Sequence, residues 1–157
     1  MTMEQVTAID SSERTLQGRY LTFYMDEELY GMDIQHIIEI IGVQPITVVP
    51  EMPEYIRGIT NLRGKIIPVM DARLRFKLEE RDYDDRTCII VLETGDVSMG
   101  MIVDAVSEVL ELYSDDVDPP PEIGGGVADY IQGVGRSGDG VIMLLDCDLL
   151  LREGGDG

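Results

Sequence analysis

An internal repeat is the feature of this sequence that most restricts its fold. Short tracts in the middle of the chain recur 75 residues later, and tracts nearer the start recur after 69 residues, in the same order. The matched tracts are 31–32 with 100–101, 39–41 with 108–110, 55–59 with 130–134, 66–67 with 141–142, and 69–71 with 144–146. Two copies of one plan predict a duplicated fold whose copies pack on a common core.

Short apolar runs separated by turn residues predict an all-β fold with short helices. Isoleucines at 34, 37, 38 and 41 recur at helical spacing and predict about two turns of helix. Pro68 cannot donate a hydrogen bond to a ladder, so its strand should be an edge strand or bulged there. The predicted strands are 20–25, 29–33, 59–62, 65–70, 88–92, 97–103, 106–112 and 141–145, with a helical turn at 71–78.

The predicted organisation is one globular domain behind a polar N-terminal segment. We expect a flexible tail at 1–17, a single domain at 18–152 divided into subdomains 18–83 and 84–147, and a terminal helix at 148–152. The N-terminal segment has no basic patch followed by an apolar run, so no secretory signal is expected. The two cysteines, Cys88 and Cys147, are isolated in apolar segments, which is typical of reduced, buried thiols in a cytosolic protein.

The charge is strongly negative. The 157 residues include 12 basic and 31 acidic side chains, a net charge of −19. This sign argues against a nucleic-acid partner and against binding to an anionic membrane. Two interpretations of the acidity stay open: an ordinary solvated surface, or adaptation to a cytoplasm with molar salt.

One segment of the chain has a net positive charge. Between residues 57 and 81 the cations outnumber the acids, and they are Arg57, Arg63, Lys65, Arg73, Arg75, Lys77 and Arg81. A basic island on an acidic protein is a candidate partner surface. The alternative is that each cation pairs locally with a surface acid, which would contribute little to stability.

Residues that could carry catalysis or bind a metal are sparse. His36 is the only histidine and should face solvent, and one histidine with two cysteines makes a zinc site unlikely. We therefore expect no metal and no cofactor. Asp71 and Asp104, at strand ends, could act as paired carboxylates, but capping of the next segment explains each equally well.

Residues 55–71 are the most distinctive tract of the chain. They read Tyr-Ile-Arg-Gly-Ile-Thr-Asn-Leu-Arg-Gly-Lys-Ile-Ile-Pro-Val-Met-Asp and are followed by Arg73, Arg75 and Phe76. This tract resembles the signature of the CheW family of chemotaxis coupling proteins. The tracts 30–34, 87–92 and 100–108 are similar to further parts of the family pattern, so the resemblance spans about 18–152.

The resemblance implies an architecture and a role. The family fold is two pseudo-symmetric, five-stranded SH3-like β-barrels that share a hydrophobic core. Family members are non-catalytic adaptors that couple the cytoplasmic hairpin tips of chemoreceptors to the regulatory domain of the histidine kinase CheA. The resemblance therefore implies a cytoplasmic protein that is recruited to receptor arrays at the membrane without inserting into it.

The resemblance also implies a receptor-binding face. The expected residues are Arg63 in a tight turn, Ile37 and Glu39 on the predicted short helix, and Asn61 and Gly58, which would shape the loop. It gives no residues for the kinase-binding face of this chain.

Two other functions stay open on the residues alone. One is a small acidic hydrolase that uses Asp71 or Asp104. The other is a stand-alone SH3-like module for proline-rich peptides, which needs an aromatic groove. The chain has no tryptophan, seven tyrosines and two phenylalanines, so aromatic side chains for such a groove are few.

Overall fold

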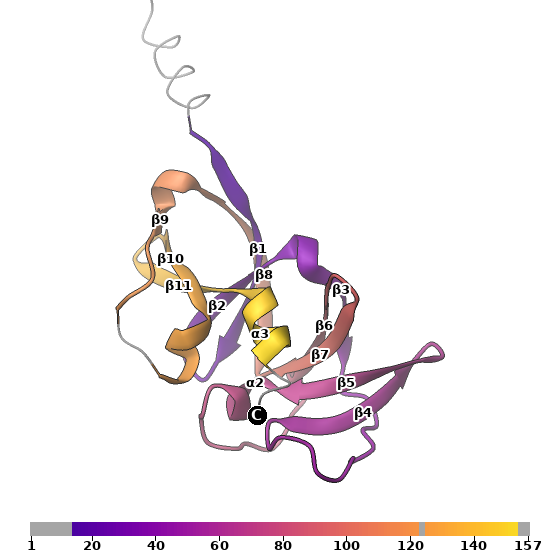
Figure 1. The fold of residues 1–157 in the computed structure, drawn as a ribbon. Coiled ribbons are helices and arrows are strands. Elements are labelled where there is room, and N and C mark those ends of the chain that lie inside the picture. The colour runs from indigo at the N-terminus through magenta and orange to yellow at the C-terminus, as the bar shows by residue number, and fades with distance from the viewer. Residues whose placement is uncertain (1–13, 123–124, 154–157) are drawn as a thin grey trace, which may run out of the picture.

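Two β-sheets and short helices make up the fold (Figure 1). The computed structural model describes residues 14–122 and 125–153. One sheet has the order β8-β1-β2-β11-β10-β9 and the other has the order β3-β6-β7-β5-β4. The strands are β1 (Leu16–Met25), β2 (Glu28–Asp33), β3 (Ile37–Gly42), β4 (Ile56–Leu62), β5 (Lys65–Asp71), β6 (Cys88–Thr94), β7 (Val97–Val103), β8 (Ala105–Tyr113), β9 (Val117–Asp118), β10 (Ile131–Ser137) and β11 (Gly140–Leu145). The helices are η1 (Ile34–His36), α2 (Ala72–Arg75), η2 (Ser114–Asp116), η3 (Gly126–Tyr130) and α3 (Cys147–Glu153).

Each sheet takes strands from both halves of the chain. The hairpin β1–β2 lies between β8 and β11, while β3, β4 and β5 join β6 and β7. Two parallel pairings make these joins, β2 with β11 and β5 with β7. The sheets therefore do not follow the expected division into 18–83 and 84–147, because the first hairpin crosses into the sheet of the second half.

The repeat predicted from the sequence is present in the structure. The parallel pair Val69 and Gly100 in one sheet corresponds to Leu144 and Gly31 in the other, at the offsets that the sequence shows. The amide of Asp71 donates to the carbonyl of Tyr55 at 2.8 Å, and the amide of Asp146 donates to that of Tyr130 at the same distance. The all-β prediction with two barrels on a shared core is confirmed, except that the short β9 gives one sheet a sixth strand.

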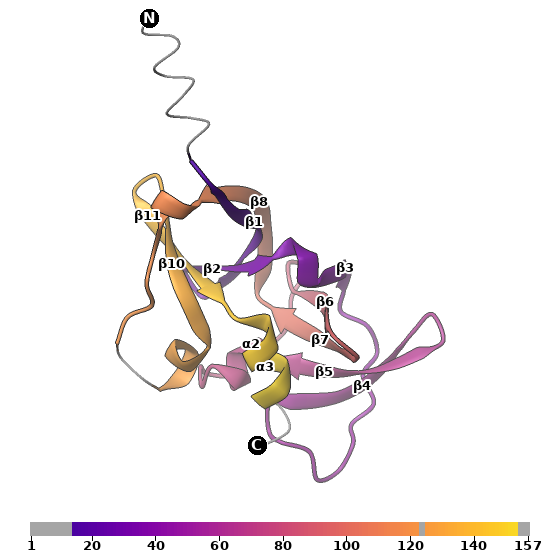
Figure 2. The same ribbon diagram turned by 45° about the horizontal axis from the view of Figure 1, so that its top comes forward.

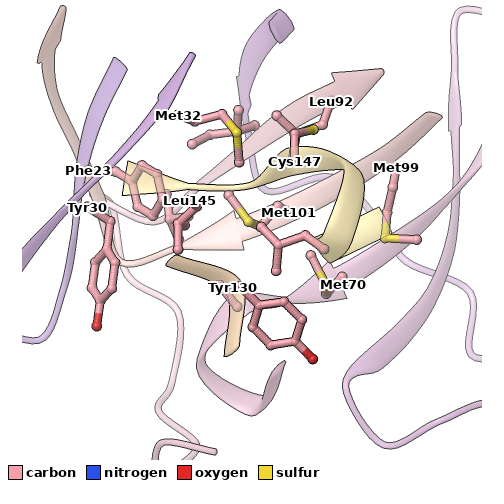
Figure 3. Packing of buried hydrophobic residues seen from close by; sticks show 14 of the residues in the cluster. Phe23, Tyr30, Met32, Met70, Leu92, Met99, Met101, Tyr130, Leu145 and Cys147 are labelled. Atoms are coloured by element: carbon pink, nitrogen blue, oxygen red, sulfur yellow. The ribbon is translucent and has the colours of Figure 1, made fainter. Parts of the chain in front are cut away.

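The shared core lies between the sheets and under α3 (Figure 3). Met32 from β2, Leu92 from β6, Met101 from β7 and Cys147 from α3 meet there, and each is 0–2 % exposed. A fully buried side chain of this size contributes about 1.5–3 kcal/mol to stability. Each sheet also encloses a smaller cluster: Ile67, Val69, Ile89, Val91 and Ile102 in one, and Tyr20, Leu112, Ile142 and Leu144 in the other. Figures 1 and 2 both show α3 between the two sheets.

The helix predicted over 34–41 is wrong. Only Ile34–His36 is helical, as one 3-10 turn, and the chain continues as strand β3 from Ile37 to Gly42. β-Branched isoleucines favour extended backbone, and β6 offers an antiparallel partner along the whole of β3. In the strand, half-buried and exposed residues alternate, so Ile38 and Ile40 face solvent at 54 % and 41 % exposure.

The chain ends and Pro68 differ from expectation in smaller ways. Of the expected tail, 1–13 lies outside the described residues, and Leu16 already pairs with Tyr113 in the sheet. The terminal helix runs from Cys147 to Glu153, close to the predicted 148–152. β5 is an inner strand rather than an edge, but its ladder with β7 begins only at Val69, just after Pro68. No helix within the described ranges is long and apolar enough to cross a membrane.

A candidate partner-binding surface

The hairpin β4–β5 ends in a rigid turn that presents Arg63. Arg63 and Gly64 have φ of +54° and +89°, the left-handed pair that a two-residue hairpin turn requires. The side-chain oxygen of Asn61 accepts a hydrogen bond from the amide of Gly64 at 2.8 Å, which closes the turn. The hairpin extends beyond the rest of the molecule in Figures 1 and 2, and the Arg63 side chain is 74 % exposed.

Arg63 reaches the strand that carries two other predicted site residues. Its Nη1 donates to Oε1 of Glu39 at 2.6 Å. The structure therefore brings Arg63 and Glu39 together, with Glu39 on a strand where the sequence suggested a helix, whereas the half-buried Ile37 packs against the main core. β3 and β4 are the outer strands of their sheet, so the ion pair connects the sheet's two ends. Because Arg63 is exposed, the pair contributes little to folding.

Gly58, on β4, lies where the preceding segment of the chain packs against this hairpin. It is buried, its φ is +150°, and a Cβ atom at this position would lie 2.0 Å from the carbonyl oxygen of Thr47. Thr47 and Ile59 exchange backbone hydrogen bonds of 2.8 and 2.9 Å, and the Thr60 hydroxyl donates to the carbonyl of Pro45 at 2.8 Å. Gly58 thus allows the segment before β4 to lie against the hairpin.

Exposed aliphatic side chains lie on both of these elements. Ile66, on β5 near the turn, is 56 % exposed, and Ile38 and Ile40 are exposed on the face of β3 opposite to Glu39. A hollow of about 270 Å³ lies beside the hairpin and is lined by Pro45, Thr47, Ile59, Thr60, Asn61 and Ile66. Sequence analysis missed the exposure of Ile38 and Ile40 because it predicted a helix there, and that of Ile66 because the apolar residues around it show no polar alternation.

Most cations of the basic island are structural. Arg73 is 8 % exposed at its side chain, and its Nη1 donates to Asp26 at 2.8 Å and to Asp104 at 2.7 Å. Burial alone would lower the pKa of Arg73, but the hydrogen bonds and charges of these two acids raise it. Arg81 also contacts Asp104, at 3.2 Å. The local-pairing alternative therefore holds for these arginines, and Arg63 also has an acid partner, Glu39, but is the most exposed of them.

Asp71 and Asp104 are held by other residues of the fold. Asp71 accepts hydrogen bonds from the amide of Arg73 at 2.9 Å and from the hydroxyl of Tyr83 at 2.8 Å, and Nε of Arg57 lies 3.4 Å away. Burial, and then the hydrogen bond to Asp71, raises the pKa of Tyr83 to about 12. The structure thus favours the capping interpretation of Asp71 over catalysis, and Asp104 has the arginine partners described above.

His36 lies beside a polar hollow of about 360 Å³ whose lining includes Asp33, Asp146 and Asp148. It is half-buried there, where the sequence suggested a residue that faces solvent. Among residues 14–122 and 125–153, no group of three or more His, Cys, Asp or Glu side chains could hold a metal ion.

Comparison with known proteins finds clear relatives of this chain. The family model described as CheW-like domain matches residues 19–154. Chemotaxis protein CheW of Klebsiella aerogenes is 38% identical over 140 residues, which cover 88% of this chain and 84% of that protein. Chemotaxis protein CheW of Treponema pallidum is 36% identical over 142 residues, 87% of this chain and 84% of that protein.

A solved structure shows the same fold. The crystal structure of scaffolding protein TtCheW from Thermoanaerobacter tengcongensis superposes with a TM-score of 0.80 at 37% identity, and the match covers 85% of this chain and 91% of that one. The family model, the curated relatives and the fold lead to one conclusion: this chain belongs to the CheW family.

Proposed function

We propose that this chain is a non-catalytic adaptor of chemotaxis that couples chemoreceptors to the histidine kinase CheA. Its partners are the cytoplasmic hairpin tip of a chemoreceptor and the regulatory domain of CheA. The protein acts in the cytoplasm and is recruited to receptor arrays at the membrane. Family membership supports this role, since the relatives are named chemotaxis proteins and the solved relative is named a scaffolding protein.

The observation that carries the proposal is the surface around Arg63. An exposed arginine on a rigid turn shares its hairpin with exposed Ile66, and it contacts Glu39 on β3, the strand whose other face exposes Ile38 and Ile40. Arginine and aliphatic anchors of this kind suit the apolar face of a partner helix. By binding receptor and kinase at once, an adaptor raises their effective concentration for each other.

The two other functions gain no support. The carboxylates that a hydrolase would need, Asp71 and Asp104, are engaged by arginines. An SH3-like peptide groove needs exposed aromatic rings, yet most aromatic side chains are buried: Tyr20, Phe23, Tyr30, Tyr55, Phe76 and Tyr130.

The test is a pair of titrations with receptor-tip and CheA regulatory-domain fragments. We expect Arg63→Ala and Arg63→Glu to weaken receptor binding by at least about 1–2 kcal/mol, about tenfold or more, as at an interface hot spot. Folding should be nearly unchanged, because the ion pair with Glu39 is exposed. CheA binding should change much less, because we assign the kinase to a separate face.

Arg136→Glu is the matched control. Arg136 lies on the hairpin β10–β11, the counterpart of β4–β5, and its 54 % exposed side chain pairs with Asp118 at 3.2 Å. Reversal of its charge should leave receptor affinity unchanged. If receptor affinity is unchanged in Arg63→Glu, or if both partners lose affinity equally while the melting curve is normal, the assignment of this surface is wrong.

A further inference from the structure

Arg75, at the end of α2, lies where the two copies of the repeat meet. Its guanidinium carbon is 4.3 Å from the centre of the Tyr55 ring and 4.6 Å from that of the Tyr130 ring. These tyrosines occupy matching positions in the two copies, and Arg75 itself is only 9 % exposed. The stacking leaves the guanidinium little freedom to turn, and it covers the faces of the group rather than its edges.

One edge of this guanidinium has no partner. Nε and Nη2 of Arg75 are buried without a hydrogen bond, and they are the only such side-chain atoms among the described residues. The two N–H groups of this edge point the same way, at the spacing of the two oxygens of a carboxylate. A buried charged donor without an acceptor is costly, so an unpaired edge favours the binding of an acceptor.

The half-buried Arg57 and the buried Arg73 of the same segment differ from Arg75 in one respect. Arg57 has an ion pair with Asp71, and Arg73 has one with Asp104, but no described acid forms an ion pair with Arg75. Acids are abundant in a chain of net charge −19, so the absence of one here is unusual.

A cavity gives room for an occupant. A hollow of about 290 Å³ is lined by Arg75 together with Pro53, Glu54, Tyr55, Leu74 and Lys77. Lys77 adds a second positive charge at the exposed rim, while Glu54 opposes it. This hollow is at the opposite end of β5 from the Arg63 turn, so it is separate from the surface proposed for the receptor.

We propose that Arg75, held between Tyr55 and Tyr130, binds a carboxylate through its Nε and Nη2 edge, with Lys77 at the rim. The carboxylate belongs either to a small organic acid or to an acidic side chain of a peptide. Since both tyrosines belong to segments that lead into the paired hairpins, an occupant here connects the two copies of the repeat.

The test follows the Arg75 Nε–H signal in proton–nitrogen spectra of the full chain. The added ligands are sodium acetate and a blocked Gly-Glu-Asp-Gly peptide, each compared with sodium chloride at equal ionic strength. We expect a saturable shift with the carboxylates and none with chloride. About a fivefold excess of acetate over its dissociation constant should raise Tm by about 2–4 °C over chloride.

The Arg75→Lys variant is the decisive comparison, because it keeps the charge but lacks the forked edge. It should lose the acetate-dependent rise in Tm, whereas Arg19→Lys, at an exposed position paired with Glu111, should keep it. Tighter binding of the peptide identifies an acidic segment of a protein as the source, and tighter binding of acetate identifies a small acid. An unsaturable shift, an equal response to chloride, or an unchanged response in Arg75→Lys overturns the proposal.

Discussion

Three arginines of this molecule have different roles, and the role of each depends on the residues around it. Arg63 is exposed on a turn, Arg73 is buried against two acids, and Arg75 is stacked between two tyrosine rings. The sequence shows all three in one basic segment. It cannot tell them apart, because the acids and rings that hold Arg73 and Arg75 come from distant parts of the chain.

Gly58 is the residue at which a single added atom should matter most. In Gly58→Ala the new Cβ would meet the carbonyl oxygen of Thr47, a backbone atom, at a backbone angle that L-residues rarely adopt. We expect a loss of more than about 3 kcal/mol in the free energy of unfolding, measured in urea, because both strain and displacement of the segment before β4 are involved.

Gly64→Ala is the control for this substitution. Gly64 also has a positive φ, but a Cβ there would meet nothing within 4 Å. Only backbone strain should remain, at a cost of about 1 kcal/mol. Equal losses for the two variants would show that the contact with Thr47 is not the cause.

At the scale of elements, each copy of the repeat has an aspartate that caps the helix after its last strand. The two aspartates differ in their further contacts. Asp71 caps α2 by accepting from the amide of Arg73, and Asp146 caps α3 by accepting from the amide of Leu149 at 3.1 Å. Only Asp71 also contacts Arg57 and Tyr83, and its side chain is 1% exposed.

The two caps therefore predict unequal losses of stability. Asp146→Ala should cost about 1 kcal/mol, as for a lost helix cap. Asp71→Ala should cost more, about 2–3 kcal/mol, because it also removes the acceptor of the Tyr83 hydroxyl and one of the two acids that pair with the half-buried Arg57. Urea unfolding of both variants measures the difference. Similar losses would mean that the contacts with Arg57 and Tyr83 contribute little.

The sequence predicts elements well where their pattern is local. The strands β4, β5 and β11 follow from apolar runs and turn residues, whereas β10 (Ile131–Ser137), rich in glycine and polar residues, was not among the predicted strands. β3 was mistaken for a helix, because Ile34, Ile37, Ile38 and Ile41 fit helical spacing and only pairing with β6 decides in favour of a strand. The pairing of β3 with β6 also positions Glu39 for its contact with Arg63. The family resemblance predicted that these two residues share a face, but it did not predict that Glu39 lies on a strand.

The whole molecule carries a large excess of negative charge. The dependence of its Tm on salt concentration should show whether that charge destabilises the fold. Acids that repel one another at low ionic strength are screened in concentrated salt. We expect Tm to rise steeply between dilute buffer and molar potassium chloride. A thermal melt across that range measures it, with glycerol as an uncharged control.

A Tm that stays flat across the salt series, or that is highest in dilute buffer, would contradict adaptation to a salty cytoplasm. Such a result would support the alternative, an ordinary acidic surface. Several exposed ion pairs, such as Arg19 with Glu111, weaken in salt and work against the expected rise. The change of Tm with salt concentration therefore reports the balance between the screening of repulsion among unpaired acids and the weakening of these ion pairs.

The crossing of the first hairpin into the other sheet has a consequence for how the chain is made. The sheet β3-β6-β7-β5-β4 has all its strands once Val103 has left the ribosome. The hairpin β1–β2, although synthesised first, must wait for β8 and then β11, which ends at Leu145. The first hairpin can pair within itself at once, but it is among the last elements to gain its outer neighbours, and until then its free edges and apolar face are open to aggregation.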